Sequence, residues 1–433
     1  MKKLLLLTFT VASFSAQAQF WTEKATGFAT AQRGINDIDI VDQNVIWAKA
    51  YDGSGGNVGT IKEFTRSTDG GETWTAGIMN LGLGTAGLGI GSISAVSDQI
   101  AWVTGHPDTG NTGGVWKTIN GGTTWSKQLT AAYSAASFTN IVYFFDENNG
   151  ITMGDPEEGY FEIYTTTNGG TNWTRVAQSN IPAHITTGIG EYGYTGDVDE
   201  AGGTLWFGTN FGRLYRSTDM GATWSVSQTP LTDMGLGSYS FSDATKGLLA
   251  TDTGLLYSTN DAGVTWVAMS PTGTFGDEIE YVPGTTNVIS AVFASGETFY
   301  STDDGMTWMV GQTDTPVTEL EFYDSTTGFG GGFNDSPTAG GIYKYTGTFL
   351  AVAQFNNETM SVSPNPSNGY VQIAGITVKQ VTVFDILGKQ VYNNTFNGLN
   401  VLDLDLTSLN SGVYLMTVTN DGGLTKTVKI VRN

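Results

Sequence analysis

The chain of 433 residues contains no cysteine, only two histidines, and 19 lysines and arginines against 41 aspartates and glutamates. Without cysteine, neither disulfides nor thiolate nucleophiles are available, so packing must hold the fold together. The acidic excess argues against nucleic acid and anionic lipid as partners, because both are negatively charged. No segment after residue 18 reaches the roughly 18 apolar residues of a membrane span, so we predict no transmembrane segment.

The N-terminus has the pattern of an export signal. Two lysines precede a mostly apolar run from Leu4 to Phe14, and Ala16-Gln17-Ala18 forms a small–x–small cleavage pattern. Residues 1–18 are therefore predicted to be a signal peptide that directs export to the periplasm.

An octapeptide of the form Ser/Thr-x-Asp/Asn-x-Gly-x-Thr-Trp recurs six times, the third copy having Asn172 in place of Thr. The tryptophans lie 51, 48, 51, 42 and 42 residues apart, which is the length of one four-stranded propeller blade. The Asp or Asn is expected to bond the turn backbone, the Gly to take a positive φ, and the Trp to pack between neighbouring sheets. These structural positions are Asp69, Trp74, Asn120, Trp125, Asn168, Trp173, Asp219, Trp224, Asp261, Trp266, Asp303 and Trp308.

Each octapeptide follows a short strand-like segment, such as YFEIYT or GRLYR, and two more such runs lie upstream. This order gives four strands per repeat, a to d, with the octapeptide between c and d. After the sixth copy, TELEFYD, GFGGGF and GGIYKYTG supply a, b and c, while FWTEKATGF near the N-terminus resembles a lone d. We therefore predict an all-β fold with a seven-bladed β-propeller over residues 19–350, closed by both chain ends, rather than six blades.

These octapeptides resemble those of the Asp-box, or BNR-repeat, proteins over roughly residues 20–350. That superfamily includes sialidases, xyloglucanases, sortilin-like receptors and propellers similar to a photosystem assembly factor. The resemblance implies the propeller fold but no reaction, because the box occurs in proteins with and without enzymatic activity.

Residues 351–360 read as a linker, and residues 361–433 show period-2 alternation and turn signals that predict a small Ig-like β-sandwich. This segment resembles the type A C-terminal sorting domain of the bacterial type IX secretion system. The resemblance rests on PNPSNG (364–369), DILGK (385–389), SGVY (411–414) and the basic ending. It implies that the type IX machinery is a partner and that the protein is released or displayed at the cell surface. An ordinary accessory β-sandwich is the alternative.

A sialidase needs several arginines around the substrate carboxylate, because guanidinium groups bind carboxylates bidentately. The propeller segment has only five arginines, and four of them flank the octapeptides or share their strands. Arg33 alone has a sequence position that fits the propeller axis, and Gly34-Ile35 follows it where a sialidase has Ile-Pro. The sequence therefore argues against sialidase activity.

Polar loops predict one candidate ligand site on the face that carries the d–a and b–c connections. The site gathers loops of blades 2, 3 and 4, and both histidines fall there. Its residues are His106, Asp108, Asp155, Glu157, Glu158, His184 and Glu191, together with Arg33 as a separate candidate. They would serve a sugar or a cation, or a carboxylate pair for glycoside hydrolysis. Solvated acidic loops are the simpler interpretation.

The propeller axis is a second candidate site, because acidic residues recur in the predicted a strands. They are Asp37, Asp39, Asp197, Asp199, Asp277, Glu278, Glu280, Glu319 and Glu321. Some of them would ring a central channel and attract a cation, whereas strand alternation would turn others onto blade faces. No metal-binding spacing or catalytic motif occurs, so a cofactor and a metal are left unassigned.

Two functions follow from these observations. The first is a secreted or cell-surface propeller that binds a glycan or protein ligand without catalysis. The alternative is a glycoside hydrolase or lyase that acts on polysaccharide through the acidic loops of blades 2 to 4. An assembly or structural role is a third and weaker interpretation.

Overall fold

The computed structural model describes residues 20–54, 61–107, 112–135, 137–347, 360–385, 389–420 and 425–433. The predicted signal peptide, nearly all of the predicted linker, Asp108 and residues 386–388 of the DILGK motif lie outside these ranges. The chain divides into two compact units, residues 1–348 and 349–433, and each is described by itself.

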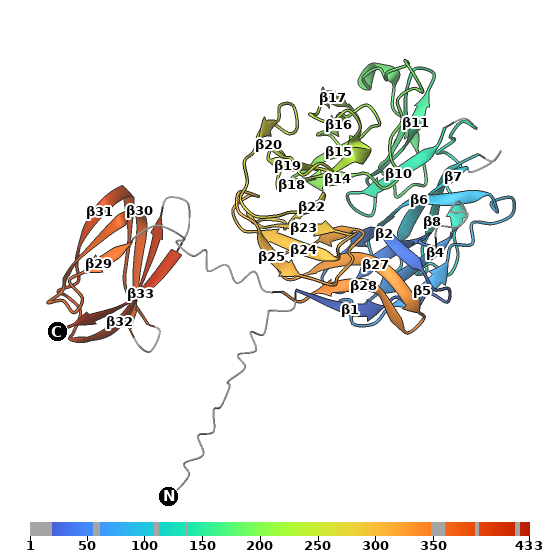
Figure 1. Ribbon diagram of the computed structural model, residues 1–433. Helices are drawn as coiled ribbons and strands as arrows, with labels where there is room; N and C mark the ends of the chain where they lie inside the picture. Colours follow the sequence, from blue (N-terminus) through green and yellow to red (C-terminus); the bar gives the residue numbers. More distant parts are fainter. Residues whose placement is uncertain are drawn as a thin grey trace, which may run out of the picture. The chain divides into compact units, whose positions relative to one another are not determined.

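The described part of the first unit forms seven four-stranded antiparallel blades around a central axis (Figure 1). Six blades take their strands in chain order, from the inner strand a to the outer strand d. They are β2 (Arg33–Ile40), β3 (Ile46–Asp52), β4 (Glu63–Ser67) and β5 (Thr75–Ile78); β6 (Leu88–Ala95), β7 (Ala101–Pro107), β8 (Gly114–Thr118) and β9 (Ser126–Lys127); β10 (Thr139–Phe144), β11 (Gly150–Glu157), β12 (Tyr160–Thr166) and β13 (Thr174–Arg175); β14 (Asp199–Ala201), β15 (Thr204–Gly208), β16 (Arg213–Ser217) and β17 (Ser225–Gln228); β18 (Gly237–Phe241), β19 (Gly247–Thr251), β20 (Leu256–Thr259) and β21 (Val267–Ala268); β22 (Glu278–Tyr281), β23 (Val288–Val292), β24 (Glu297–Ser301) and β25 (Met309–Gln312). Short 3₁₀ turns at Gln178–Asn180 and Met234–Leu236 lie in connections between blades.

The seventh blade joins the two ends of the propeller. Its strands β26 (Leu320–Phe322), β27 (Gly328–Ser336) and β28 (Ala339–Tyr345) are completed by β1 (Trp21–Ala25), which pairs antiparallel with β28. Trp21 is 1% exposed, and its ring packs edge-on against Tyr345 at 5.6 Å between centroids. The predicted seven-bladed fold, with a closing strand from the N-terminus, is confirmed.

The six octapeptides form one recurring turn between strands c and d. In the first copy, Asp69 accepts hydrogen bonds from the backbone N–H of Thr73 at 2.9 Å and from its hydroxyl at 2.6 Å. Gly71 has φ +80° and donates to the Ser67 hydroxyl at 2.8 Å. In every other copy the Asp or Asn accepts the same backbone N–H bond, so the turn satisfies these polar groups itself.

The octapeptide tryptophans pack between successive blades. Trp224 of the fourth blade lies in one cluster with Ile151 and Ile163 of the third blade, and Trp308 of the sixth blade lies with Leu248 of the fifth. The remaining copies likewise join a cluster that includes the preceding blade. These rings supply much of the apolar contact between blades in a protein without disulfides.

Because strands within a blade alternate in direction, the propeller has two distinct faces. The octapeptide turns and the a–b turns emerge on one, which we call the turn face. The d–a connections and b–c turns emerge on the other, which we call the loop face.

The second unit is a small β-sandwich built from five strands. They are β29 (Ser361–Ser363), β30 (Tyr370–Asp385), β31 (Gln390–Asp405), β32 (Gly412–Asn420) and β33 (Thr425–Arg432). The long strand β30 pairs with β29 and β31 in its first part and with β31 and β32 in its second. Val371, Ile373, Val381 and Val383 from both parts pack in its core. Within the described ranges of the whole chain, no helix has the length and apolar character to cross a membrane.

Candidate functional site

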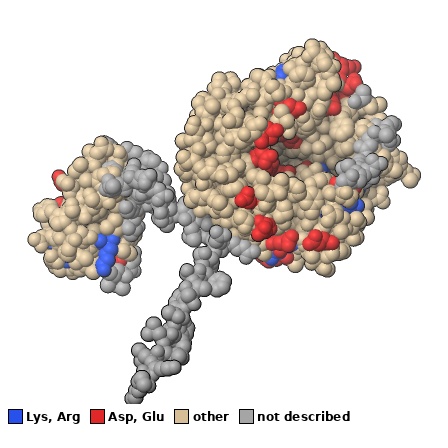
Figure 2. Space-filling view, in the orientation of Figure 1, with Lys and Arg blue, Asp and Glu red and all other residues tan. Residues whose placement is uncertain are grey.

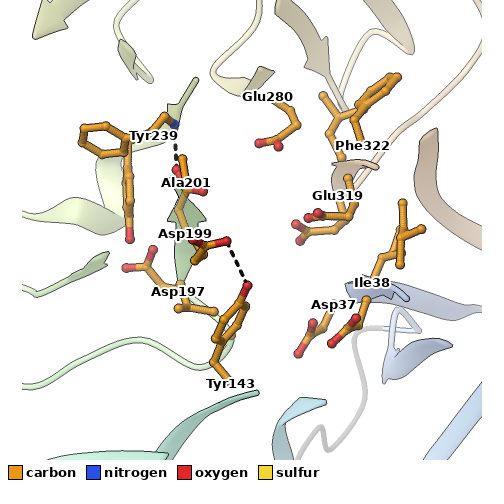
Figure 3. A pocket seen from close by; sticks show the side chains of 18 of the residues that line it. Asp37, Ile38, Tyr143, Asp197, Asp199, Ala201, Tyr239, Glu280, Glu319 and Phe322 are labelled. Carbon is orange, nitrogen blue, oxygen red and sulfur yellow. Dashed lines mark hydrogen bonds between the residues drawn. The ribbon is translucent and has the colours of Figure 1, made fainter. Parts of the chain in front are cut away.

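A channel of about 930 Å³ runs along the axis of the propeller. Its walls are the inner strands of the blades, and Figure 2 shows acidic side chains gathered around its opening. Acidic residues in or just before the inner strands of four blades line the channel, and Figure 3 shows Asp37, Asp197, Asp199, Glu280 and Glu319 around the cavity. The nine acidic residues that line the channel are Asp37, Asp39, Asp197, Asp199, Glu200, Glu278, Glu280, Glu319 and Glu321, of which Glu200 was not predicted. Asp277, the ninth residue predicted for the axis, lies at the channel mouth instead.

Three of these carboxylates also hold the blades together. Asp37 and Asp39 accept hydrogen bonds from the backbone N–H groups of Ile93 and Ala95 in the next blade, at 2.9 and 2.8 Å. Asp199 accepts from the N–H of Phe241 in its next blade at 2.7 Å. Serine hydroxyls take this role in other blades, as Ser94 does for Phe144. Accepting hydrogen bonds from the inner-edge N–H groups of the next blade is therefore one role of these acidic residues.

Burial raises the pKa of the channel carboxylates. It raises the pKa to about 6 for Asp37 and Asp197, to about 7 for Asp39 and Asp199, and to about 8 for Glu278, where Asp277 and Asp197 add repulsion. The pKa values of Glu280, Glu319 and Glu321 are also raised, first by burial and then by neighbouring carboxylates. Lys49 is 2% exposed and lowers the pKa of Asp37 by its charge. Among the described residues, no three acidic or histidine side chains converge as a metal site would require.

These raised pKa values predict that the propeller loses stability as pH rises. An unfolded carboxyl group titrates near pH 4, whereas the folded groups retain their protons to higher pH. The free energy of unfolding is therefore expected to fall as pH rises from about 4 to about 8, because the folded state binds more protons than the unfolded state in that window. Thermal unfolding across this range tests the sign. The paired substitution Glu319→Gln and Glu321→Gln is expected to flatten the dependence, and a melting temperature that rises with pH would contradict it.

The predicted loop cluster contains two carboxylates that are already engaged. Glu191 is 3% exposed and accepts hydrogen bonds from Thr209 Oγ1 at 2.8 Å and from the N–H of Ile185 at 2.9 Å. It also pairs with Arg213 at 2.9 Å. Asp155 accepts from the Asn140 side chain at 2.7 Å and from the N–H of Gly193 at 3.2 Å, and burial raises its pKa to about 6. Both carboxylates therefore stabilise the long connection between blades 3 and 4.

The other described members of the loop cluster contact different partners. Glu158 pairs with Arg175 at 3.2 Å, and the carbonyl of Glu157 accepts from the same guanidinium at 3.4 Å. His106 stacks on Phe138 with 4.1 Å between centroids, and burial lowers its pKa to about 4, with a further contribution from the charge of Lys49. His184 is half-buried on the blade 3–4 connection, beside Ile185, which donates to Glu191.

Arg33 starts β2, and its guanidinium is held by two carboxylates. It binds Glu63 through Nε and lies 3.5 Å from Asp52 through Nη1. A ligand carboxylate would have to compete with both. This geometry agrees with the argument against a sialidase-type carboxylate site.

Sequence reasoning missed three aromatic residues near the loop-face ends of b strands. Tyr51, Phe293 and Phe333 occupy equivalent registers in blades 1, 6 and 7, counted from the residue at which strand b starts its pairing with strand a. The same register in blades 2 and 3 holds His106 and Asp155. This position of strand b is aromatic in blades 1, 6 and 7 and polar in blades 2 and 3. Aligning the b strands by sequence would therefore have shown that the three aromatic residues occupy equivalent places.

The C-terminal unit matches a family model over residues 361–433, described as "Secretion system C-terminal sorting domain". Residues 361–433 are a C-terminal sorting domain. The predicted type IX resemblance is thereby confirmed, and the sorting domain marks the protein for export, either secreted or displayed on the cell surface. It also implies an interaction with the type IX machinery. No curated protein sequence matches the chain.

Among solved structures, two YCF48 propellers share the fold. One, "YCF48 from Cyanidioschyzon merolae", is 18% identical over 76% of this chain and 99% of its own, with a TM-score of 0.54. The other, "YCF48 bound to D1 peptide", is 18% identical over 76% of this chain and 96% of its own, with a TM-score of 0.51. A GH74 enzyme from Niastella koreensis matches at 15% identity over 91% of this chain and 69% of its own, with a TM-score of 0.25 that is too low for an argument.

Proposed function

We propose that this exported propeller is a non-catalytic binding protein whose loop face takes a positively charged protein ligand. The observation that carries the proposal is the axial channel, where nine acidic residues from four blades surround a cavity of about 930 Å³. Ionised carboxylates in a concave surface focus the field and draw oppositely charged partners to it, and a bound cation would in turn favour the ionised forms of these groups.

The charge balance of the propeller supports a cationic partner. Residues 19–360 carry 37 acidic and 12 basic residues, whereas residues 361–433 carry four and five. Lys49 is a buried base beside the channel, close enough to affect Asp37 and Glu319. A ligand with several positive charges would compensate the remaining carboxylates and favour their ionised forms.

A protein ligand is also supported by the shared fold. One of the YCF48 propellers of the same architecture is described as bound to a peptide. At 18% identity this comparison supports the kind of ligand only, since fold alone does not specify function.

Hydrolysis of a polysaccharide has less support. A glycosidase needs one carboxyl group to deliver a proton and another to act on the sugar or on water. Asp155 and Glu191, the most deeply placed acids of the loop cluster, instead bind protein N–H, amide and guanidinium groups.

Binding and turnover can be separated with the purified protein. It is expected to bind lysine-rich and arginine-rich peptides on a peptide array, with affinity that falls as salt is added, because screening weakens charge attraction. Matched glutamate-rich peptides should not bind. The same protein is then tested on a glycan array and in a reducing-sugar assay. Release of sugar from a polysaccharide, or glycan binding that salt does not affect, would contradict the proposal.

A further inference from the structure

Three aromatic rings form a continuous arc on the loop face, across the joint between the last blades and the first. Phe293 of blade 6 lies 5.5 Å from Phe333 of blade 7, and Phe333 lies 5.5 Å from Tyr51 of blade 1, measured between ring centroids. The arc crosses the place where the chain ends close the propeller, since Gly34 of blade 1 pairs with Phe333 of blade 7.

The backbone around the arc leaves room for these rings. A Cβ atom at Gly34 would lie 2.3 Å from the Tyr51 ring, and one at Gly53 would lie 1.9 Å from the Phe333 ring. Larger residues at these two positions would displace the aromatic side chains. At the end of the arc, Phe293 remains 48% exposed, although burying an aromatic ring is favourable.

A pocket of about 370 Å³ lies beside the arc, and we call it the mouth pocket. Its apolar wall is Tyr51, Leu236, Phe293 and Val317, and its acidic wall is Asp252, Asp277 and Glu278. None of the lysines and arginines that the structure describes lines it. Glu278 and its neighbours Gly235 and Gly237 also line the axial channel, so the two cavities adjoin on the loop face.

Aromatic faces with carboxylates beside them recognise organic cations. The ring quadrupole attracts a cation within about 6 Å of the centroid, and a carboxylate adds a charge-assisted hydrogen bond. We propose that the mouth pocket holds one lysine or arginine side chain of the partner protein, so that the partner's remaining positive charges face the axial channel. This inference rests on the proposed function and names the part of the ligand that enters the pocket.

Charge and size favour this occupant over a sugar. Asp252 and Asp277 have no basic neighbour in the pocket lining, so a cation would offset charge that a neutral sugar ring would leave uncompensated. A volume of about 370 Å³ suits a single long side chain and lies near the lower end for ligand pockets.

The test uses the full protein and a fluorescent peptide of alternating lysine and glycine, with its fully lysine-acetylated form as the ligand control. Phe293→Ala and Asp277→Asn remove one aromatic and one acidic wall from exposed positions. Met306→Ala and Glu147→Gln are the matched controls. Met306 is also 48% exposed in an octapeptide turn, and Glu147 is exposed beside the octapeptide glycine Gly169 on the turn face.

We expect each mouth-pocket variant to weaken binding of the lysine peptide about tenfold, and each control variant to change it less than about twofold. The acetylated peptide should not bind. If Glu147→Gln weakens binding as much as Asp277→Asn, or if Phe293→Ala has no effect, the mouth pocket is not the site, although the proposed function stands. If the unaltered protein binds neither peptide, or binds both equally, the proposed function fails with it.

Discussion

A protein that lacks residues 361–433 is expected to stay inside the cell envelope and to be missing from the medium and the outer surface. The sorting domain occupies this segment, and the propeller has its own core and its own closed ring of blades. Fractionation followed by immunoblotting measures the effect, and we expect nearly complete loss of the exported form.

Limited proteolysis is the control for this deletion. A retained but protease-resistant propeller would show that export, and not folding, was lost. Normal amounts of truncated protein outside the cell would contradict the role assigned to the sorting domain.

The substitution Trp224→Ala is expected to lower the free energy of unfolding by about 3–5 kcal/mol, because removing a buried ring leaves a cavity. Trp224 is 8% exposed, donates from Nε1 to the carbonyl of Gly221 at 2.9 Å, and packs 5.1 Å from Phe207 between centroids. Denaturant titration measures the loss.

Met220→Ala in the same turn is the matched control, since Met220 is 49% exposed. We expect it to change stability by less than about 0.5 kcal/mol, as surface substitutions usually do. A loss below about 1 kcal/mol for Trp224→Ala would show that the ring does not hold neighbouring blades together.

The architecture could be predicted because the sequence of each repeat specifies its turn, and because the two chain ends together complete the seventh blade. Each octapeptide specifies a turn through its Asp or Asn and its Gly, and the spacing of the tryptophans fixes the length of a blade. The partner of strand β1 is more than 300 residues away, yet β1 pairs with β28 and completes the seventh blade, as predicted. Leaving strands β1 and β28 unpaired would expose two sheet edges, so closure was the stable solution.

The polar contacts of the loop cluster were not predictable in the same way. Glu191 binds Arg213 and Thr209, which both belong to blade 4. Asp155 accepts hydrogen bonds from Asn140 and Gly193. Such pairs depend on how long connections fold over the blades, which no local pattern specifies. The acidic residues of these loops therefore stabilise the connection between blades, although in sequence they resemble a ligand site.

The axial channel could be predicted in part. The repeat placed acidic residues in the inner strands, but the side of each strand that faces the axis depends on register. Asp37 and Asp39 face the channel, and the side chain of Ile38 between them points to the other side of the strand. Glu319 and Glu321 face the channel in the same way, on either side of Leu320. The aromatic arc was missed because attention to polar residues alone passes over Tyr51, Phe293 and Phe333.

Photo-cross-linking tests most directly whether the loop face binds a cationic ligand. A lysine–glycine peptide that carries a diazirine on one lysine is bound to the full protein, irradiated, and mapped by mass spectrometry. The account predicts cross-links at residues 46–53, 232–239, 275–279 and 290–296, around the mouth pocket. Cross-links confined to the octapeptide turns or to residues 361–433 would contradict it.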